Sequence, residues 1–139
     1  VVHHTTFIDG LIKSGKLKLT KEVAASVAYH YSCYICRYHG IYDAPLDVVK
    51  AIPGAALVEL ARNRSRSVCC GAGGGRFWME EHIGERINEM RAKEALAAGT
   101  DTVGSNCPFC LIMLRDGVAA AGREDVRTQD IAELVAAAL

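Results

Sequence analysis

Along this chain, blocks in which apolar residues recur every three or four positions alternate with short blocks that are apolar throughout. The first kind predicts amphipathic helices, and the second predicts buried strands. The predicted helices span residues 5–15, 43–52, 76–98, 108–121 and 130–139, and the predicted strands span residues 26–30, 55–60, 101–105 and 125–129. A helix followed by four strand–helix units predicts an α/β fold, a parallel sheet of about four strands flanked by helices.

Residues at the ends of these helices support the assigned boundaries. Asp43 is expected as the N-cap of the second helix, with Pro45 in its first turn, where a missing N–H does no harm. Asp130 and Glu133 have the spacing of a capping box at the start of the last helix. Gly99 follows the longest helix as its stop.

The same spacing predicts which helical side chains face the core. In the longest helix they are Met79, Ile83, Ile87 and Met90, which repeat at intervals of four, four and three residues. In the first helix they are Phe7, Leu11 and Ile12, and in the last they are Ile131, Leu134, Val135 and Ala138. Trp78 is expected in the core or as a wall beside a site.

Composition narrows the class of protein. The chain has 139 residues, half of them apolar, with 16 basic and 16 acidic residues. Balanced charge gives no general attraction to nucleic acid, and no apolar run approaches the ~20 residues that span a bilayer. The sequence has no secretory signal, and its opening VVHHTTF, without an initiator Met, is typical of the interior of a protein. We expect residues 1–139 to be a single cytoplasmic domain, without a membrane span, from a longer protein.

The candidate chemistry lies in six cysteines, which form three close pairs: Cys33 and Cys36, Cys69 and Cys70, and Cys107 and Cys110. Disulfide scaffolds of small secreted proteins scatter their cysteines, and a chain of this length has no need of such staples. A reactive dithiol is a second alternative. The paired spacing favours a metal or metal-cluster site over both.

Each pair follows a predicted strand. The pairs begin at Cys33, Cys69 and Cys107, after the strands at 26–30, 55–60 and 101–105. Ligands of open α/β sheets bind outside the carboxyl ends of the parallel strands. The sequence therefore predicts that all three pairs meet at one end of the sheet.

Thiolates bind soft or borderline metals, which include zinc, copper(I) and iron–sulfur clusters. Zinc takes four ligands, and its CxxC pairs usually lie ~15–20 residues apart. Here 70 residues separate Cys36 from Cys107, and Cys69 and Cys70 would be left over. A multi-iron cluster uses more thiolates and accepts dispersed ligands, so it is favoured. A zinc site made by Cys33, Cys36, Cys107 and Cys110 stays open as an alternative.

The turn CCGAGGG is rich in glycine, at Gly71, Gly73, Gly74 and Gly75. Without Cβ atoms the backbone can approach a ligand closely, and its consecutive N–H groups can form an anion-binding nest. Hydrogen bonds from such groups to cluster sulfurs tune the reduction potential. A dinucleotide-binding GxGxxG motif is absent, because the frames that start at Gly71 and Gly73 end on Arg76 and Trp78.

Taken together, these motifs resemble the cysteine-rich CCG domain of heterodisulfide reductases and related iron–sulfur oxidoreductases. That family has one cysteine, a CCG tripeptide and a CxxC pair. Here 35 residues lie between Cys33 and Cys69, and 36 lie between Cys70 and Cys107. The segments CCGAGGGRFWMEE, NCPFC, GIYDAP and QDIAELVAAAL are also typical, so the resemblance covers nearly the whole chain. It is strongest with large bacterial membrane-associated reductases in which the CCG region follows a ferredoxin-like domain.

The resemblance implies an iron–sulfur domain of an oxidoreductase. Its implied cluster ligands are Cys33, Cys69, Cys70, Cys107 and Cys110, a five-cysteine set that holds a non-cubane [4Fe–4S] cluster in heterodisulfide reductases. Gly71, Gly73 and Gly74 are the implied backbone contacts of the cofactor. The implied partners are a ferredoxin-type domain or subunit, a flavoprotein or a membrane redox subunit at the cytoplasmic face. The redox couple would be a disulfide, a quinone, a flavoprotein or an organic acid.

The first cysteine motif departs from the family pattern YHDPCYLGR. In YHYSCYICR, residues 31–32 stand in place of an Asp–Pro turn, and Cys36 stands in place of a glycine. Cys36 is therefore a sixth candidate ligand or a buried apolar side chain. His30 is expected to be a hydrogen-bonded histidine at a strand end, and Arg37 and Arg76 are candidates to offset the negative charge of a cluster.

Two functions of other classes stay open beside electron transfer. One is a structural zinc–thiolate domain used in assembly, and the other is a metal-free redox module that uses the CPFC segment as a dithiol.

Overall fold

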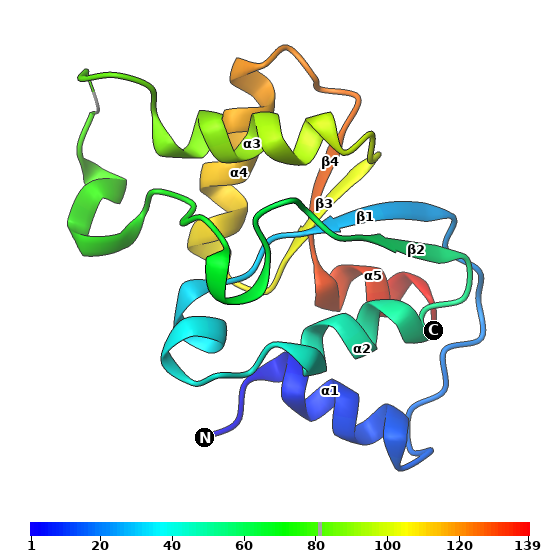
Figure 1. The fold of residues 1–139 in the computed structure, drawn as a ribbon. Helices are drawn as coiled ribbons and strands as arrows, with labels where there is room; N and C mark the ends of the chain where they lie inside the picture. Colours follow the sequence, from blue (N-terminus) through cyan, green and yellow to red (C-terminus); the bar gives the residue numbers. More distant parts are fainter. Residues whose placement is uncertain (81) are drawn as a thin grey trace.

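A computed structural model describes residues 1–80 and 82–139 of the chain. The helices are α1 (His4–Lys13), α2 (Asp43–Ala51), α3 (Ile87–Ala97), α4 (Pro108–Ala120) and α5 (Ile131–Ala137). The strands are β1 (Ala25–Tyr29), β2 (Ala55–Val58), β3 (Thr102–Ser105) and β4 (Arg127–Asp130). Shorter turns are the π-helical turn Tyr34–Tyr38 and the 3-10 segments Arg64–Arg66 and Gly73–Trp78. The predicted α/β order is confirmed (Figure 1).

The four strands form one parallel sheet in the order β2-β1-β3-β4. In the centre, Val27 of β1 pairs with Leu57 of β2 on one side and with Thr102 of β3 on the other. The chain passes from β1 outward to β2 and then returns across β1 to β3, so the winding reverses between β1 and β3. Ligands of open α/β sheets bind at such a switch point, beyond the carboxyl ends of the strands.

Helices cover both faces of the sheet. Figure 1 shows α1, α2 and α5 below the strands and α3 and α4 above them. Alternate residues of β1 serve the two cores: Val27 and Tyr29 pack with α2 and α5, whereas Ala28 packs with Val103 and with α3 and α4. The described residues therefore form two hydrophobic cores, one on each side of the sheet.

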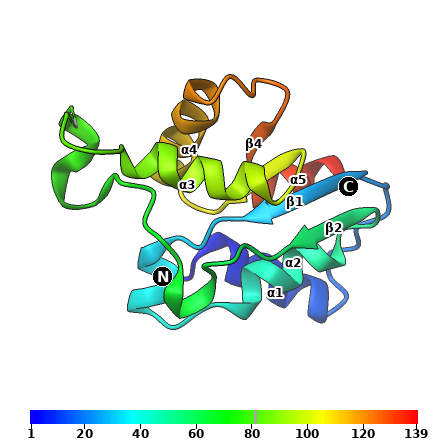
Figure 2. The same ribbon diagram turned by 45° about the horizontal axis from the view of Figure 1, so that its top comes forward.

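The predicted helix at 76–98 is right only in its second half, since α3 begins at Ile87. Residue 81 of that prediction lies outside the described part of the chain. Before it, Gly73–Trp78 is a kinked 3-10 segment with φ of 64° at Gly74 and 80° at Gly75, and Gly84 has φ of 71°. These left-handed conformations interrupt an α-helix. Both views show Gly73–Trp78 lying away from the sheet (Figures 1 and 2).

The side chains expected on the buried face of that helix are mostly exposed. Trp78, Met79 and Ile83 are 82%, 67% and 86% exposed, so the placement of these residues in the core was wrong. The buried residues of α3 are instead Asn88, Arg91, Ala92 and Ala95. The apolar spacing at Met79 and Ile83 was periodic, but no second surface covers it in the described part of the chain.

Two smaller predictions at helix ends and faces need correction. Ile12 of α1 packs on the core as expected, together with Ile8, whereas Phe7 is exposed and Leu11 is only partly buried. Asp43 is the first residue of α2 rather than its N-cap, because Tyr42 takes the cap position. The Asp43 carboxylate is instead 2.9 Å from Nη2 of Arg64 and holds the loop after β2.

The capping box predicted for α5 is confirmed. The Asp130 carboxylate accepts a hydrogen bond from the Ala132 N–H at 2.8 Å, and the Glu133 carboxylate accepts one from the Asp130 N–H at 2.7 Å. Ile131, Leu134 and Val135 then face the core as expected. None of the helices in the described part of the chain has the length and apolarity needed to cross a bilayer.

Replacing this cap tests how much α5 depends on it. We expect Asp130→Ala to lower the free energy of unfolding by about 1 kcal/mol, because two N–H groups at the helix start lose their partner. Asp130→Asn retains the accepting oxygen and is the matched control, with a loss of only a few tenths of a kcal/mol expected. Urea unfolding followed by circular dichroism gives both values, and equal losses would contradict a capping role.

Candidate metal centre

Four thiols and one imidazole gather beyond the carboxyl ends of β1 and β3, on the α3–α4 side of the sheet. His30 directly follows β1, and Cys107 is the cap residue between β3 and α4. Cys110 lies in the first turn of α4, and the Cys69–Cys70 pair lies in the loop after β2. Cys70 and Cys110 belong to the core on that side, and Cys69 and Cys107 pack against it. The structure therefore joins two of the three predicted cysteine pairs.

The contacts run as a chain from one thiol to the next. Cys69 hydrogen-bonds to Cys70, Cys70 to Cys110, and Cys110 to Cys107. A ring nitrogen of His30 and the sulfurs of Cys70 and Cys110 all lie within 4.8 Å of one another, and all three residues are buried. This spacing is compact enough for several of the side chains to share one metal centre.

Hydrogen bonds make two of the four thiols more acidic than usual. Donation from Cys110 is the main effect that lowers the pKa of Cys107 to about 6, with help from the N–H of Phe109 and the Ser32 hydroxyl. The pKa of Cys70 is well below its ordinary value, because contacts with Cys110, Cys69 and His30 favour its thiolate. Cys110 has a single S–H, so it donates to Cys107 or to Cys70 and not to both at once. The cluster therefore favours thiolate at Cys70 and Cys107, and the thiolate is the form that binds metals.

The glycine turn supplies backbone donors, as its sequence suggested. The Gly71 N–H is 3.3 Å from the Cys69 sulfur, and the Gly73 N–H also donates to it. Gly71 has φ of 94°, and a Cβ there would lie 3.2 Å from Cβ of Ile87 and 3.3 Å from Cε of Met113. Only glycine fits that position without strain. Gly74 lies farther along the turn, in the exposed 3-10 segment.

The remaining pair, Cys33 and Cys36, is not part of this chain of thiols. Cys36 is buried in the opposite core with Tyr29 and Ile35, where burial raises the pKa of its thiol to about 11. Cys33 is partly exposed at the start of the π-helical turn, and its negative charge as a thiolate contributes to the raised pKa of Cys36. All six thiols are free, so the described residues contain no disulfide framework. Cys36 therefore packs in a different core from Cys70 and Cys110.

The departure from the family pattern before Cys33 has a visible consequence. Ser32 is buried, and its hydroxyl hydrogen-bonds to the Cys107 sulfur, a contact that a proline could not make. Tyr31 is buried as well and donates to the Glu59 carboxylate at 3.1 Å. The two substituted residues therefore tie the first cysteine loop to the CPFC loop and to the end of β2.

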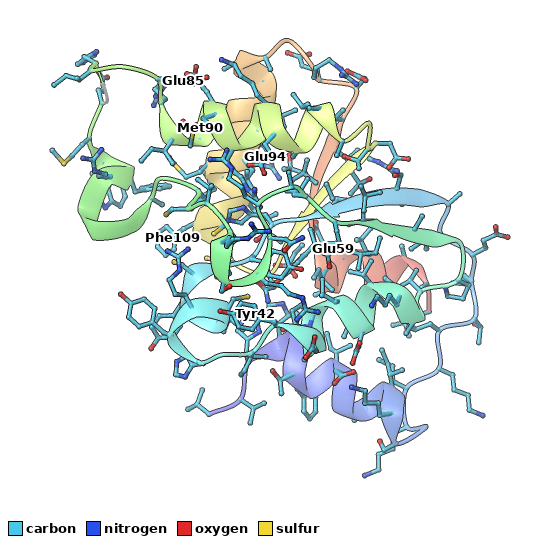
Figure 3. All side chains as sticks on the ribbon, viewed as in Figure 1. Tyr42, Glu59, Glu85, Met90, Glu94 and Phe109 are labelled. Carbon is cyan, nitrogen blue, oxygen red and sulfur yellow. The ribbon has the colours of Figure 1, made fainter. Side chains whose placement is uncertain are left out.

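A contact that the sequence did not suggest lies behind the cluster. The guanidinium of Arg91, on α3, is completely buried, and its Nε donates to Nδ1 of His30 at 3.2 Å. Its Nη1 donates to Glu94 at 2.8 Å and to the Arg62 carbonyl at 3.1 Å. Figure 3 shows Glu94 on the side of α3 that faces the body of the molecule. His30 is thus the hydrogen-bonded histidine at a strand end that we expected.

Arginine side chains and aromatic rings lie on the loops around the centre. Nη2 of Arg37 donates to the Ser67 carbonyl at 2.6 Å, so this side chain braces the backbone that leads into the cysteine pair. The rings of Phe77 and Phe109 meet edge to face at 5.4 Å (Phe109 is labelled in Figure 3). A shallow pocket of about 80 Å³ opens beside Gly71, and Arg76 is among the residues that line it.

A parallel α/β sheet that presents clustered thiols at its switch point has the donor set that soft metals and clusters use. The family model for the cysteine-rich CCG domain matches residues 27–115 of this chain. The chain belongs to that family, as the motifs indicated. Because the matched range spans both the CCG turn and the CPFC loop, it includes the four clustered thiols.

Relatives match the chain over 97% or more of its length. It is 47% identical over 98% of its length to a probable iron–sulfur-binding oxidoreductase, FadF, of Bacillus subtilis. It is 38% identical over 97% of its length to the EtfAB:quinone oxidoreductase of Syntrophomonas wolfei. It is 39% identical over its full length to one subunit of the dihydromethanophenazine:CoB–CoM heterodisulfide reductase of Methanosarcina barkeri. The chain spans 19%, 20% and 34% of the length of these relatives.

The residues present fit an iron–sulfur cluster. Four sulfur donors converge, the pKa values of two of them are lowered, and a backbone N–H of the glycine turn donates to a third. Soft sulfur donors with surrounding N–H groups are the environment that such clusters use. Cys33 could add a fifth thiol only from the partly exposed turn that follows β1.

Proposed function

We propose that residues 1–139 form an iron–sulfur-cluster-binding domain that carries electrons within a larger oxidoreductase. The observation that carries this proposal is the chain of four thiols at the switch point of the sheet. When bound there, a cluster supplies one-electron storage and transfer. The names of the relatives, which are oxidoreductases or their subunits, support this reading of the site.

We propose Cys33, Cys69, Cys70, Cys107 and Cys110 as the ligands of a [4Fe–4S] cluster of the non-cubane type. The four clustered thiols support their own assignment by proximity. Cys33 is assigned by its place in the motif and by Ser32, whose hydrogen bond to Cys107 brings the first cysteine loop toward the cluster. The glycine turn would hold the cluster sulfurs through its N–H groups, as Gly71 and Gly73 now hold Cys69.

The partners we propose are a ferredoxin-type iron–sulfur domain or subunit as the electron source, with a flavoprotein or membrane redox subunit beyond it. The domain would work at the cytoplasmic face of a membrane as part of a longer protein. The redox couple is a disulfide, a quinone, a flavoprotein or an organic acid. Relatives named for a quinone and for a heterodisulfide support two of these.

A structural zinc site is the second candidate, and the convergence of four thiols supports it as well. Zinc prefers four thiolates in a closed tetrahedral site. The set Cys33, Cys36, Cys107 and Cys110 is disfavoured, because Cys36 lies in the opposite core. A zinc ion would use the four clustered cysteines instead.

Metal and sulfide analysis of the anaerobically purified protein distinguishes the two. We expect about four iron and four acid-labile sulfide per chain, a brown colour and an EPR signal in one redox state. Stoichiometric zinc without sulfide would instead make the domain a structural module. A protein that holds neither metal and cycles between dithiol and disulfide would support the CPFC redox alternative.

A further inference from the structure

We propose that His30 serves as a hydrogen-bond donor to the Cys70 sulfur and not as a metal ligand, and that buried Arg91 fixes it in that role. The inference rests on the proposed function, since it concerns the surroundings of a cluster ligand. It makes His30 and Arg91 positioning residues that set the properties of the centre.

By distance alone, His30 would count as a ligand. Its ring nitrogen and the sulfurs of Cys70 and Cys110 lie within 4.8 Å of one another. The residue is held rigidly at the switch point, because its N–H donates to the Gly104 carbonyl at 2.7 Å and its side chain is buried. Proximity and burial therefore leave two roles open, ligand or donor.

Arg91 decides between these roles. Its Nε lies 3.2 Å from Nδ1 of His30, and a guanidinium has only donors, so Nδ1 must be the acceptor. The ring proton is then on Nε2, the nitrogen that Arg91 leaves available for the sulfurs. A protonated nitrogen cannot bind a metal, whereas it can donate to the Cys70 sulfur. Histidines that do bind metals donate their other N–H to a carboxylate, a carbonyl or water, and here a donor occupies that place.

The packing around Arg91 fixes its direction and leaves excess positive charge. Its side chain is 0% exposed, and its Nη1 is anchored to Glu94 and to the Arg62 carbonyl. Arg62 also binds Glu94 at 2.9 Å, so two guanidinium groups share one carboxylate. Nη2 of Arg91 is buried without a hydrogen-bond partner among the described residues, an arrangement that is unfavourable for stability alone. Positive charge and an N–H donor near a cluster both favour its more negative, reduced state.

The tautomer of the His30 ring can be determined by NMR in the metal-free protein. Two-bond ¹H–¹⁵N correlation spectra of the reduced, metal-free protein labelled with ¹⁵N should show Nδ1 of His30 unprotonated and Nε2 protonated. A proton on Nδ1 would overturn the inference, because Nε2 would then be free to bind a metal. This result does not depend on whether the site holds a cluster.

Two variants of His30 test its role as a hydrogen-bond donor in the protein that holds the cluster. His30→Gln keeps a side-chain N–H donor, and we expect it to retain iron, sulfide and a near wild-type reduction potential. His30→Leu should retain iron but become harder to reduce by at least tenfold in the equilibrium constant, a shift of about 59 mV for one electron. Loss of iron in both variants would show that His30 is a ligand. An unchanged potential in His30→Leu would overturn the donor role.

Arg91→Met and Arg62→Met form a matched pair, since each removes a guanidinium bound to Glu94 and only Arg91 contacts His30. We expect a negative shift for Arg91→Met and a clearly smaller one for Arg62→Met, whereas equal shifts would overturn the role of Arg91. If Arg91→Met does not fold, the tautomer spectrum still decides the inference. Wild-type protein without iron and sulfide would refute the proposed function, and that spectrum would then decide the role of His30 by itself.

Discussion

Cys70→Ala is expected to reduce the iron and sulfide of the anaerobically purified protein to background. Cys70 is the central member of the thiol chain, with hydrogen bonds to both Cys69 and Cys110. Its acidic thiol also makes it a preferred thiolate ligand. Removal of this sulfur breaks the donor set in the middle, so the other thiols can no longer hold one cluster. The measurement is the iron and sulfide content, with the visible spectrum as a second readout.

The matched control is Cys36→Ala, which removes a buried thiol from the other side of the sheet. This variant should keep its iron and sulfide and lose about 1 kcal/mol of stability from the lost apolar contact. Thermal unfolding of both variants separates loss of the cluster from loss of the fold. Full iron in Cys70→Ala, or loss of iron in Cys36→Ala, would contradict the proposed ligand set. Cys33→Ala in the same series distinguishes a five-thiol set from a four-thiol set.

The order of strands and helices could be predicted because the strands are short apolar blocks between helical ones. Val27 and Ala28 are adjacent in sequence and are buried in opposite cores, as expected for a parallel strand covered on both faces. The strand order β2-β1-β3-β4 could not be predicted from the sequence, because it depends on which edge of the sheet each new strand joins. The CCG and CPFC motifs could still be placed at one end of the sheet, because the carboxyl ends of parallel strands lie at the same end whatever the strand order.

The helix predicted from apolar periodicity is wrong where no other described residues pack against its apolar side chains. The spacing of Met79 and Ile83 suits a helix, but Gly74, Gly75 and Gly84 have left-handed conformations, and both apolar side chains are exposed. Apolar spacing shows which side chains would share a face of a helix, and it says nothing of what covers that face. The helix that does form, α3, buries Arg91 against His30, the residue that follows β1.

The details of the site escaped prediction because they depend on long-range contacts. The Arg91–His30 hydrogen bond joins residues 61 positions apart, and no local motif marks either one. Cys36 could not be separated from Cys33 by spacing alone. The π-helical turn that buries Ile35 and Cys36 but leaves Cys33 partly exposed has no sequence signature that we recognised.

Gly117→Ala is expected to destabilise the protein by about 1–3 kcal/mol, although alanine is the better helix former. Gly117 lies in α4 where that helix crosses α3. A Cβ at this position would lie 2.6 Å from the Asn88 carbonyl oxygen and 2.8 Å from Cβ of Ala92. Both neighbours belong to a packed helix, so the overlap is relieved only if the two helices separate.

Gly10→Ala is the control, since Gly10 lies in α1 and a Cβ added there would have no neighbouring atom of the described residues within 4 Å. This variant should gain about 0.5–1 kcal/mol. The two substitutions are chemically identical, so opposite signs of the stability change in urea unfolding separate the helix contact from helix propensity.

The contact between α3 and α4 also concerns the metal centre, because α3 carries Arg91 and α4 carries Cys110. We therefore expect Gly117→Ala, and not Gly10→Ala, to lower iron retention. Equal stability changes in the two variants would mean that α3 and α4 can move apart at little cost. The close contact at Gly117 would then not be needed to position Arg91 and Cys110.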